Sequence, residues 1–185
     1  MLKLVEGEKV TKQLLSKEQI AARVKELAAE INKDYEGKPI TLLGTLTGAN
    51  IFLADLAREL TLDVQIDFLK VSSYYSATKS TGEVRLVHPP ALEIAGRHVI
   101  IVEDIIDTGH TAVFLRNFST AANAASVAMC SLLNKPERRE VQDVECEYLG
   151  FDIENVFVVG YGLDYAQRYR NLPYIGILEL EKGTN

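Results

Sequence analysis

Residues 97–111 read RHVIIVEDIIDTGHT, and this stretch decides the fold class. Its first half is a run of aliphatic and β-branched residues, which is typical of a strand buried on both faces of a sheet. Its second half passes through Asp-Thr-Gly into an expected helix from about His110 to Asn123. The stretch therefore predicts a strand over 97–103, a turn, and then a helix.

The segments on either side continue this alternation. The elements expected from their periodicity are helices over 16–35 and 50–60, strands over 40–44, 63–71, 84–88 and 126–134, and shorter extended pieces around 145–151, 156–160 and 174–180. Ser16 and Gln19 have the spacing of a capping box at the start of the first helix. Strands that alternate with helices indicate an α/β fold with a twisted, mainly parallel sheet flanked by helices.

Length and composition fit one ordinary globular domain over residues 1–185. Hydrophobic residues make up 47% of the chain and charged residues 25%. No apolar run approaches the roughly 20 residues that span a bilayer, and MLKLVEGEKV has no signal-peptide core. Cys130 and Cys146 have neither metal-type nor disulfide-framework spacing. We therefore expect a cytoplasmic protein with no membrane contact, and the net charge of −6 argues against a nucleic-acid partner.

Polar residues with ligand-binding chemistry gather where the central strand ends. Adjacent carboxylates at Glu103 and Asp104 would be costly near a core unless they meet hydroxyls or a metal, and a ribose diol offers two neighbouring donors. The helix that follows residues 107–111 begins with free N–H groups, which favour a phosphate. Taken alone, the same residues also fit a solvated loop with a simple helix cap, or the acidic site of a signalling receiver domain.

The whole run VIIVEDIIDTGHT closely resembles the phosphoribosyl-pyrophosphate signature of type I phosphoribosyltransferases, in the version found in hypoxanthine-guanine enzymes. The resemblance extends to LLGTLTGANIFLADLAREL, SSYYSATKSTGEVRL, SLLNKPERR and GFDIENVFVVGYGLDYAQRYRNLPYIGIL, which together span most of the chain from residue 40 onward. It implies the type I fold, with a small hood subdomain formed from the N- and C-terminal segments. The implied reaction is Mg²⁺-dependent salvage, in which a 6-oxopurine base receives the phosphoribosyl group of phosphoribosyl pyrophosphate.

The resemblance also implies roles for the residues around the signature. Glu103 and Asp104 would hold the ribose hydroxyls and help to position Mg²⁺. The turn at 107–111 would bind the 5′-phosphate through its N–H groups and through Thr108 and Thr111, with Gly109 and His110 between them. Where the family commonly has Lys, this chain has His110, which on its own reads as a solvated side chain.

A second group of residues would handle the base. Asp107 matches the proposed proton-transfer residue that faces N7 of the purine. Lys135 matches the donor to the exocyclic O6, although a lone Lys at a strand end is more often a surface residue. Phe157 matches the aromatic that stacks on the base, with core packing as its alternative, and Val158 would present backbone groups to the base edge.

A third group would bind the pyrophosphate. Asp164 matches a ligand of a second Mg²⁺, and Arg170 matches an arginine that reaches pyrophosphate oxygens. Leu46-Thr47-Gly48 lies where the family has a pyrophosphate turn that typically contains a non-proline cis peptide. Thr47 replaces the family's basic residue there, which removes a charged side chain. The loop at 72–83 corresponds to a lid, with Ser73 and Tyr74 closing over the pyrophosphate.

Two other functions stay open from the sequence. One is a regulatory protein of the same fold that senses phosphoribosyl pyrophosphate without transferring it. The other is the same chemistry on another base, since the sequence does not rank hypoxanthine, guanine and xanthine. Relatives of this type are dimers or tetramers, so a homodimer or homotetramer is expected.

Overall fold

A computed structural model describes residues 8–73, 84–142 and 144–180, and its main feature is a six-stranded sheet. The strand order is β4-β3-β2-β5-β6-β7. The strands are β2 (Ile40–Thr45), β3 (Val64–Ser73), β4 (Val84–His88), β5 (His98–Ile106), β6 (Ser126–Asn134) and β7 (Tyr148–Asp152). All neighbours pair in parallel except β4, which runs antiparallel to β3. The predicted α/β class with a mainly parallel sheet is confirmed.

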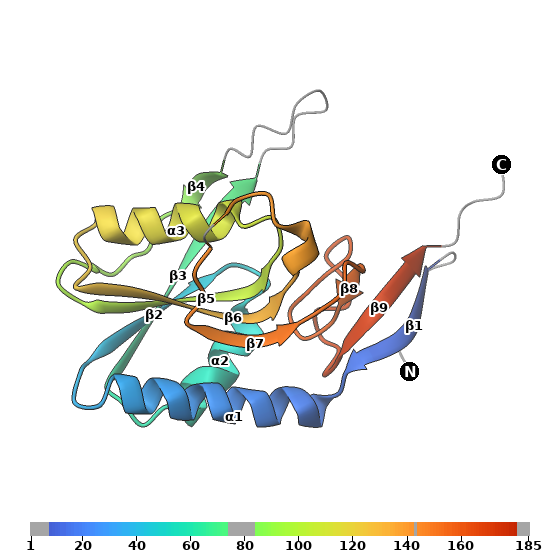
Figure 1. Ribbon diagram of the computed structural model, residues 1–185, viewed down its shortest axis with the longest axis horizontal. Coiled ribbons are helices and arrows are strands. Elements are labelled where there is room, and N and C mark those ends of the chain that lie inside the picture. Colours follow the sequence, from blue (N-terminus) through green and yellow to red (C-terminus); the bar gives the residue numbers. More distant parts are fainter. Residues whose placement is uncertain (1–7, 74–83, 143, 181–185) are drawn as a thin grey trace.

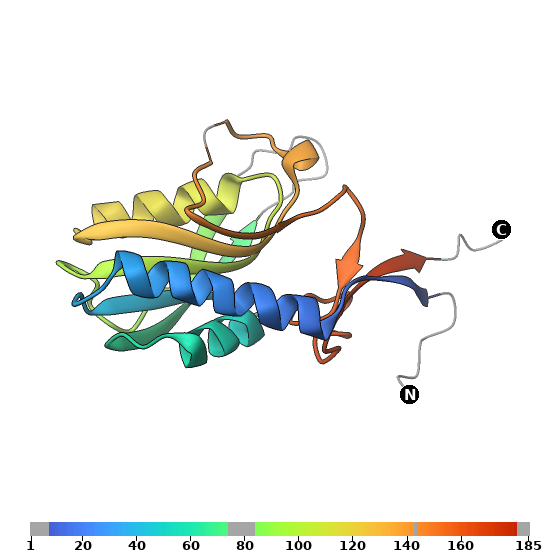
Figure 2. The same cartoon turned by 60° about the horizontal axis from the view of Figure 1, so that its bottom comes forward.

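Helices cover both faces of this sheet. In Figures 1 and 2, α1 (Lys17–Asp34) and α2 (Asn50–Glu59) lie against one face, and α3 (His110–Ala121) lies against the other. Strand β5 supplies both cores, because successive side chains point to opposite faces. Ile100 and Val102 pack with α1 and α2, whereas Val99 and Ile101 pack with α3.

The start of α1 shows how closely local sequence specifies local structure. The backbone N–H of Ser16 donates to Gln19 Oε1 at 2.8 Å, and the N–H of Gln19 donates back to Ser16 Oγ at 3.2 Å. Both bonds of the predicted capping box are therefore present, and they supply partners that the first turn of a helix lacks.

A second, three-stranded sheet lies beyond the carboxyl ends of the parallel strands (Figure 1). It consists of β1 (Glu8–Leu15), β9 (Ile175–Leu180) and β8 (Val158–Val159), in that order and all antiparallel. The sequence analysis assigned no element to residues 8–15. Their pairing with β9, from Glu8 opposite Leu180 to Leu15 opposite Ile175, makes them a strand.

Two of the boundary shifts lie next to the site. Strand β5 ends at Ile106 rather than at residue 103, because its pairing with β6 continues to Ile106 opposite Asn134. Strand β3 likewise continues through Ser73, into the stretch expected to be a loop; Tyr74 and the rest of that loop, up to residue 83, lie outside the described residues. The other expected elements lie within three residues of their predicted bounds. In the part of the chain that the structure describes, no helix is long and apolar enough to cross a membrane.

Candidate active site

A cavity of about 280 Å³ opens where β2 and β5 end, between the large sheet and the segment that follows β8. Its lining comprises Thr45, Leu46, Thr47, Gly48, Val71, Glu103, Asp104, Ile105, Thr111, Asp164 and Arg170. A hollow of about 90 Å³ adjoins it and is lined by the turn at 107–109 and the start of α3. A larger hollow of about 360 Å³, between α1 and α2, contains none of the predicted site residues. The fold thus brings together residues predicted from three distant parts of the sequence.

Glu103 is the most deeply buried acid of this cavity, with 5% of its surface exposed. Its Oε2 accepts a hydrogen bond from Thr45 Oγ1 at 2.7 Å, whereas Oε1 has no partner among the described residues. Burial, and then the charge of Asp104, raises the pKa of Glu103 to about 8, against the opposing effect of the Thr45 hydroxyl. The site therefore presents an unsatisfied carboxyl oxygen that a hydroxyl donor or a cation would stabilise.

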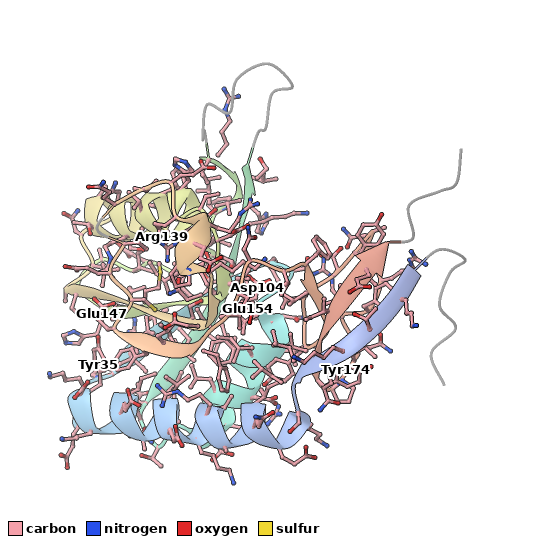
Figure 3. All side chains as sticks on the ribbon, turned by 45° about the vertical axis from the view of Figure 1, so that its right-hand side comes forward. Tyr35, Asp104, Arg139, Glu147, Glu154 and Tyr174 are labelled. Carbon is pink, nitrogen blue, oxygen red and sulfur yellow. The ribbon has the colours of Figure 1, made fainter. Side chains whose placement is uncertain are left out.

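Asp104 follows Glu103 on β5, and Figure 3 shows it where the large sheet meets the small one. Burial raises its pKa to about 6, while the N–H of Ile105, which donates to Asp104 Oδ1 at 2.9 Å, acts in the opposite direction. The charge of Arg170 lowers this pKa and that of Asp164 raises it. The protonation of Asp104 therefore depends on the segment that follows β8 as well as on its own strand.

The turn at 46–48 packs tightly between two other parts of the site. A Cβ on Gly48 would overlap the carboxylate of Asp104, and a Cβ on Gly162 would overlap the Gly48 carbonyl. Gly162 also has a φ of +102°, which a side chain would disfavour. The peptide bond between Leu46 and Thr47 is cis. Glycine at 48 and 162 therefore lets three backbone segments meet at the cavity.

Asp164 and Arg170 lie on the segment that follows β8, and they contact each other. Arg170 Nη2 lies 2.8 Å from Asp164 Oδ1, and Arg170 Nη1 donates to the Gly162 carbonyl at 2.7 Å. The N–H of Gln167 donates to the other carboxylate oxygen of Asp164 at 2.8 Å. Tyr161, in the same segment, donates its hydroxyl proton to Asp55 of α2 at 2.5 Å, and burial raises the pKa of this phenol. The segment after β8 is thus held both by its internal hydrogen bonds and by the bond from Tyr161 to α2.

The predicted phosphate turn joins β5 to α3. Gly109 has a φ of +95° and immediately precedes the helix, and Thr108 is buried with 7% of its surface exposed. The first N–H groups of a helix have no acceptor within it, so they are available to an anion at this point. His110 is not a purely solvated side chain, because its Nε2 lies 3.1 Å from Glu140 Oε2.

Of the predicted base-binding residues, Lys135 lies beside that turn, because its N–H donates to the Ile106 carbonyl, whereas Phe157 and Val158 line neither the cavity nor the adjoining hollow. Lys135 directly follows β6 and is buried, with 8% exposed. Burial lowers the pKa of its ammonium group; Asp107 opposes this shift and Arg138 adds to it. Phe157 is 52% exposed and meets the ring of Tyr165 edge-on at 5.8 Å, which excludes the core-packing alternative for Phe157. Val158 is buried in β8 opposite Ile177.

Three residues that were not predicted from the sequence bind Asp107 or Glu103. Arg138 Nε donates to Asp107 Oδ1 at 3.0 Å, and Arg139 Nη1 donates to the Asp107 carbonyl at the same distance. Thr45 is the hydroxyl partner of Glu103. The two arginines lie within the SLLNKPERR block. The sequence does not show whether two adjacent arginines in a polar turn bind another residue or are simply solvated.

The acidic residues of the cavity offer oxygen ligands only. No cluster of three or more His, Cys, Asp or Glu side chains arranged around one point occurs among residues 8–73, 84–142 and 144–180. Glu103, Asp104 and Asp164 nevertheless line the same cavity, and one Glu103 oxygen lacks a partner among those residues. Mg²⁺ prefers oxygen ligands and needs only one or two carboxylates beside water and phosphate, so the donor set fits this ion.

Several known proteins resemble this chain in sequence and in structure. The family model described as a phosphoribosyl transferase domain matches residues 10–166. A hypoxanthine-guanine phosphoribosyltransferase of Streptococcus agalactiae is 46% identical over 172 residues, covering 93% of this chain and 95% of the relative. The crystal structure of such an enzyme from Bacillus anthracis aligns with a TM-score of 0.87 and 42% identity, over 93% of this chain and 99% of that one. A hypoxanthine phosphoribosyltransferase from Staphylococcus aureus aligns with a TM-score of 0.89 and 42% identity, over 95% of each chain.

Proposed function

Because the chain belongs to the phosphoribosyltransferase family, we propose that it transfers the 5-phosphoribosyl group of phosphoribosyl pyrophosphate to N9 of hypoxanthine or guanine. The products are IMP or GMP and pyrophosphate, which makes the protein a pentosyltransferase of purine salvage. The observation that carries this proposal is the cavity at the ends of β2 and β5. It joins a carboxylate pair, an Asp–Arg pair and the 46–48 turn at the edge of the phosphate turn.

The ribose 5-phosphate moiety occupies the middle of this arrangement. Glu103 and Asp104 accept hydrogen bonds from the 2′ and 3′ hydroxyls, and this role is supported by Glu103 Oε1, which no described residue contacts with a hydrogen bond. The 5′-phosphate binds at the turn over residues 107–111, including Gly109 and His110, through the N–H groups at the start of α3 and the hydroxyls of Thr108 and Thr111. Carboxylates on this side also stabilise the positive charge that develops on the ribose in the transition state.

Mg²⁺ would be held by Glu103, Asp104 and Asp164 together with the pyrophosphate group. Bound there, the ion neutralises phosphate charge and so makes pyrophosphate a better leaving group. Arg170 binds pyrophosphate oxygens from the Asp164 side, and the turn formed by Leu46, Thr47 and Gly48 donates backbone N–H groups. Thr47 brings no charge to this turn. Ser73, the last residue of β3, would lie over the pyrophosphate; Tyr74, which was expected beside it, lies outside the described residues.

The purine lies between Phe157 and the polar groups of Lys135 and Asp107. Lys135 donates to O6, which selects 6-oxo over 6-amino purines, since an unpaired buried donor is costly. Asp107 accepts the N7 proton as N9 attacks the anomeric carbon. The exposed ring of Phe157 stacks on the base, and the backbone of Val158 faces its edge.

We also propose the wider setting of this reaction. The chain forms a single phosphoribosyltransferase domain over residues 1–185, in which the sheet of β1, β8 and β9 acts as a hood over the cavity. The enzyme works in the cytoplasm, as a homodimer or homotetramer, without nucleic-acid or membrane partners.

A spectrophotometric initial-rate assay tests the function. Phosphoribosyl pyrophosphate and Mg²⁺ are supplied with hypoxanthine, guanine, xanthine or adenine. We expect turnover of hypoxanthine or guanine, no turnover of adenine, and complete loss of activity in chelator. Binding of phosphoribosyl pyrophosphate without turnover of any base would identify a sensor instead and refute the proposal.

A further inference from the structure

Residues 135–141, which we call the collar, run alongside the turn that joins β5 to α3. The collar contains the short helix η1 (Pro136–Arg138) and begins at Lys135, whose N–H donates to the Ile106 carbonyl at 2.9 Å. Two further N–H groups of the collar, those of residues 140 and 141, donate to the Thr108 carbonyl at 3.0 and 3.2 Å. The collar therefore binds the turn through the carbonyl oxygens on one side of it.

Arg139 adds a side-chain hydrogen bond to these backbone bonds between the collar and the turn. Its Nη1 donates to the carbonyl of Asp107 at 3.0 Å, and its Nη2 donates to the side-chain oxygen of Asn134, the last residue of β6. Asn134 is in turn bonded to Asp152 of β7 at 2.6 Å. The arginine stem packs on the turn as well, because a Cβ on Gly109 would lie 3.1 Å from Arg139 Cδ. Figure 3 shows Arg139 on the collar, beside α3.

These bonds fix the direction of the peptide groups in the turn. The carbonyls of residues 106, 107 and 108 all point to the collar. A trans peptide places its N–H opposite its carbonyl, so the N–H groups that follow these carbonyls point away from the collar. That side of the turn is the one continuous with the start of α3, where N–H groups without helical acceptors favour an anion.

We propose that Arg139 is the positioning residue of the 5′-phosphate subsite. It holds the peptide group between Asp107 and Thr108 with the Thr108 N–H toward the phosphate, and it links this subsite to Lys135 through the same collar. Arg139 touches no substrate; it acts through the turn. The inference rests on the function proposed above.

The variant Arg139→Met tests this role, because methionine keeps an apolar stem over Gly109 and removes both donors. The readout is a ratio of inhibition constants, that of inosine divided by that of IMP, in the transferase assay. Inosine lacks only the 5′-phosphate, so the ratio reports the contribution of the phosphate subsite alone. We expect the ratio to fall at least tenfold in Arg139→Met.

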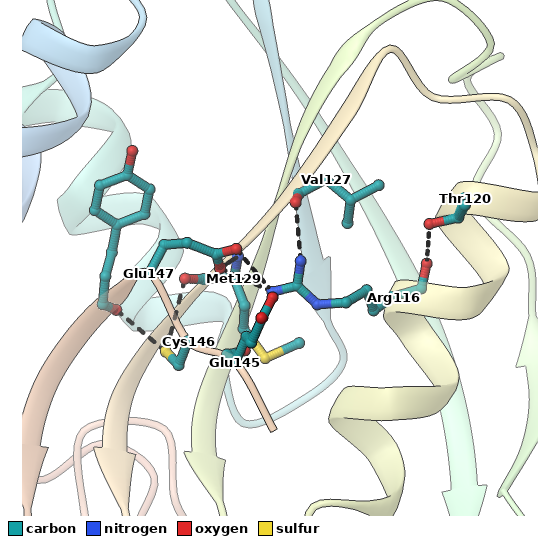
Figure 4. Close-up of polar contacts among 8 residues, drawn as sticks. Arg116, Thr120, Val127, Met129, Glu145, Cys146 and Glu147 are labelled. Carbon is teal, nitrogen blue, oxygen red and sulfur yellow. Dashed lines mark hydrogen bonds and ion pairs between the residues drawn. The ribbon is translucent and has the colours of Figure 1, made fainter. Parts of the chain in front are cut away.

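Arg116→Met is the matched control. Figure 4 shows that Arg116, on α3, also holds carbonyls, those of Val127 at 3.0 Å and Glu145 at 3.1 Å, and that it pairs with Glu147. Its contacts join α3 to β6 and to the segment just before β7, and none of them is made to a residue of the turn. Loss of Arg116 should lower the melting temperature and leave the ratio unchanged.

The outcomes separate the inference from the function. An unchanged ratio in an active Arg139→Met enzyme, or equal falls in both variants, would overturn the positioning role and leave the function intact. Absence of turnover and of IMP inhibition in the wild type would overturn the function, and the inference with it. Should Arg139→Met fail to fold, Arg139→Lys retains a cation but has one nitrogen in place of the two that reach Asp107 and Asn134, and its ratio should fall at least threefold; no fall would refute the role.

Discussion

Replacing Glu103 by Gln should stabilise the substrate-free protein, and more so at high pH. In the folded chain the pKa of Glu103 is about 8, against an ordinary value of 4.5. A raised folded-state pKa means that the folded state holds its proton more tightly than the unfolded state does. The stability contributed by this proton is fully present below pH 4.5 and is lost as pH rises toward 8.

The size of this loss follows from the two pKa values. Each pKa unit corresponds to about 1.4 kcal/mol, so keeping Glu103 protonated in the folded state, when the unfolded state has lost this proton, would alone cost about 4 kcal/mol at pH 7.5. Because Asp104 titrates with it, we assign about 2–3 kcal/mol to Glu103. Gln can still accept the Thr45 hydroxyl bond and never ionises. In a chain of this size the gain corresponds to about 5–10 °C in melting temperature.

The measurement is thermal unfolding of both proteins in chelator, without substrates, at pH 4.5 and 7.5. We expect Glu103→Gln to melt several degrees higher at pH 7.5 and at nearly the wild-type temperature at pH 4.5. The exposed acid Glu137, changed to Gln, is the control and should shift neither value. Addition of Mg²⁺ and phosphoribosyl pyrophosphate should stabilise the wild type far more than Glu103→Gln. An equal effect at both pH values, or a less stable variant at pH 7.5, would refute the reasoning that retaining the Glu103 proton destabilises the empty site.

Three further substitutions separate the parts of the site. Asp164→Ala should raise the Mg²⁺ and pyrophosphate requirements at least tenfold, or about 1.4 kcal/mol, with little change in the KM for hypoxanthine; unchanged Mg²⁺ dependence in steady-state kinetics would remove the metal assignment. Lys135→Ala should lower kcat/KM for 6-oxopurines by about 100-fold or more, while phosphoribosyl pyrophosphate binding, measured by calorimetry, stays within about threefold; equal losses in both would contradict its role toward O6. Tyr161→Phe removes the hydroxyl that donates to Asp55 and should lower the free energy of unfolding, measured in urea, by about 1–3 kcal/mol. It should also raise the Mg²⁺ concentration needed for half-maximal rate. Tyr148→Phe, which removes a similar bond to Asp34 at 2.9 Å far from the cavity, should affect stability only; the same Mg²⁺ response in both variants would rule out a link from Tyr161 to the metal site.

Elements whose determinants lie within themselves could be predicted from the sequence. The capping box of α1 depends on two residues three apart, and both of its bonds formed as expected. The aliphatic run of β5 predicted a buried strand for the same reason. Its true end at Ile106 could not be predicted, because it depends on how long the pairing with β6 continues, and that is a property of two segments.

The site residues also fall into those that the sequence predicts and those that it does not. Glu103, Asp104 and residues 107–111 follow one another, so the sequence alone marked them as a group. Arg138 and Arg139 act on Asp107 from about thirty residues away in sequence, and one of these bonds goes to a carbonyl, which every residue possesses. No side-chain pattern in the sequence reports an acceptor of that kind. Whether the cavity residues perform the roles proposed for them is what the variants above decide.

The pairing of β1 with β9 has a consequence for how the chain folds as it is synthesised. Every strand of the large sheet lies between these two in sequence, so that sheet can assemble while β9 is still inside the ribosome. During that time β1 has no strand to pair with. The three-stranded sheet, and with it the cavity, is therefore completed last. Binding of nucleotide by a nascent chain should therefore appear only after residue 180 has left the exit tunnel, well after the parallel core becomes resistant to proteolysis.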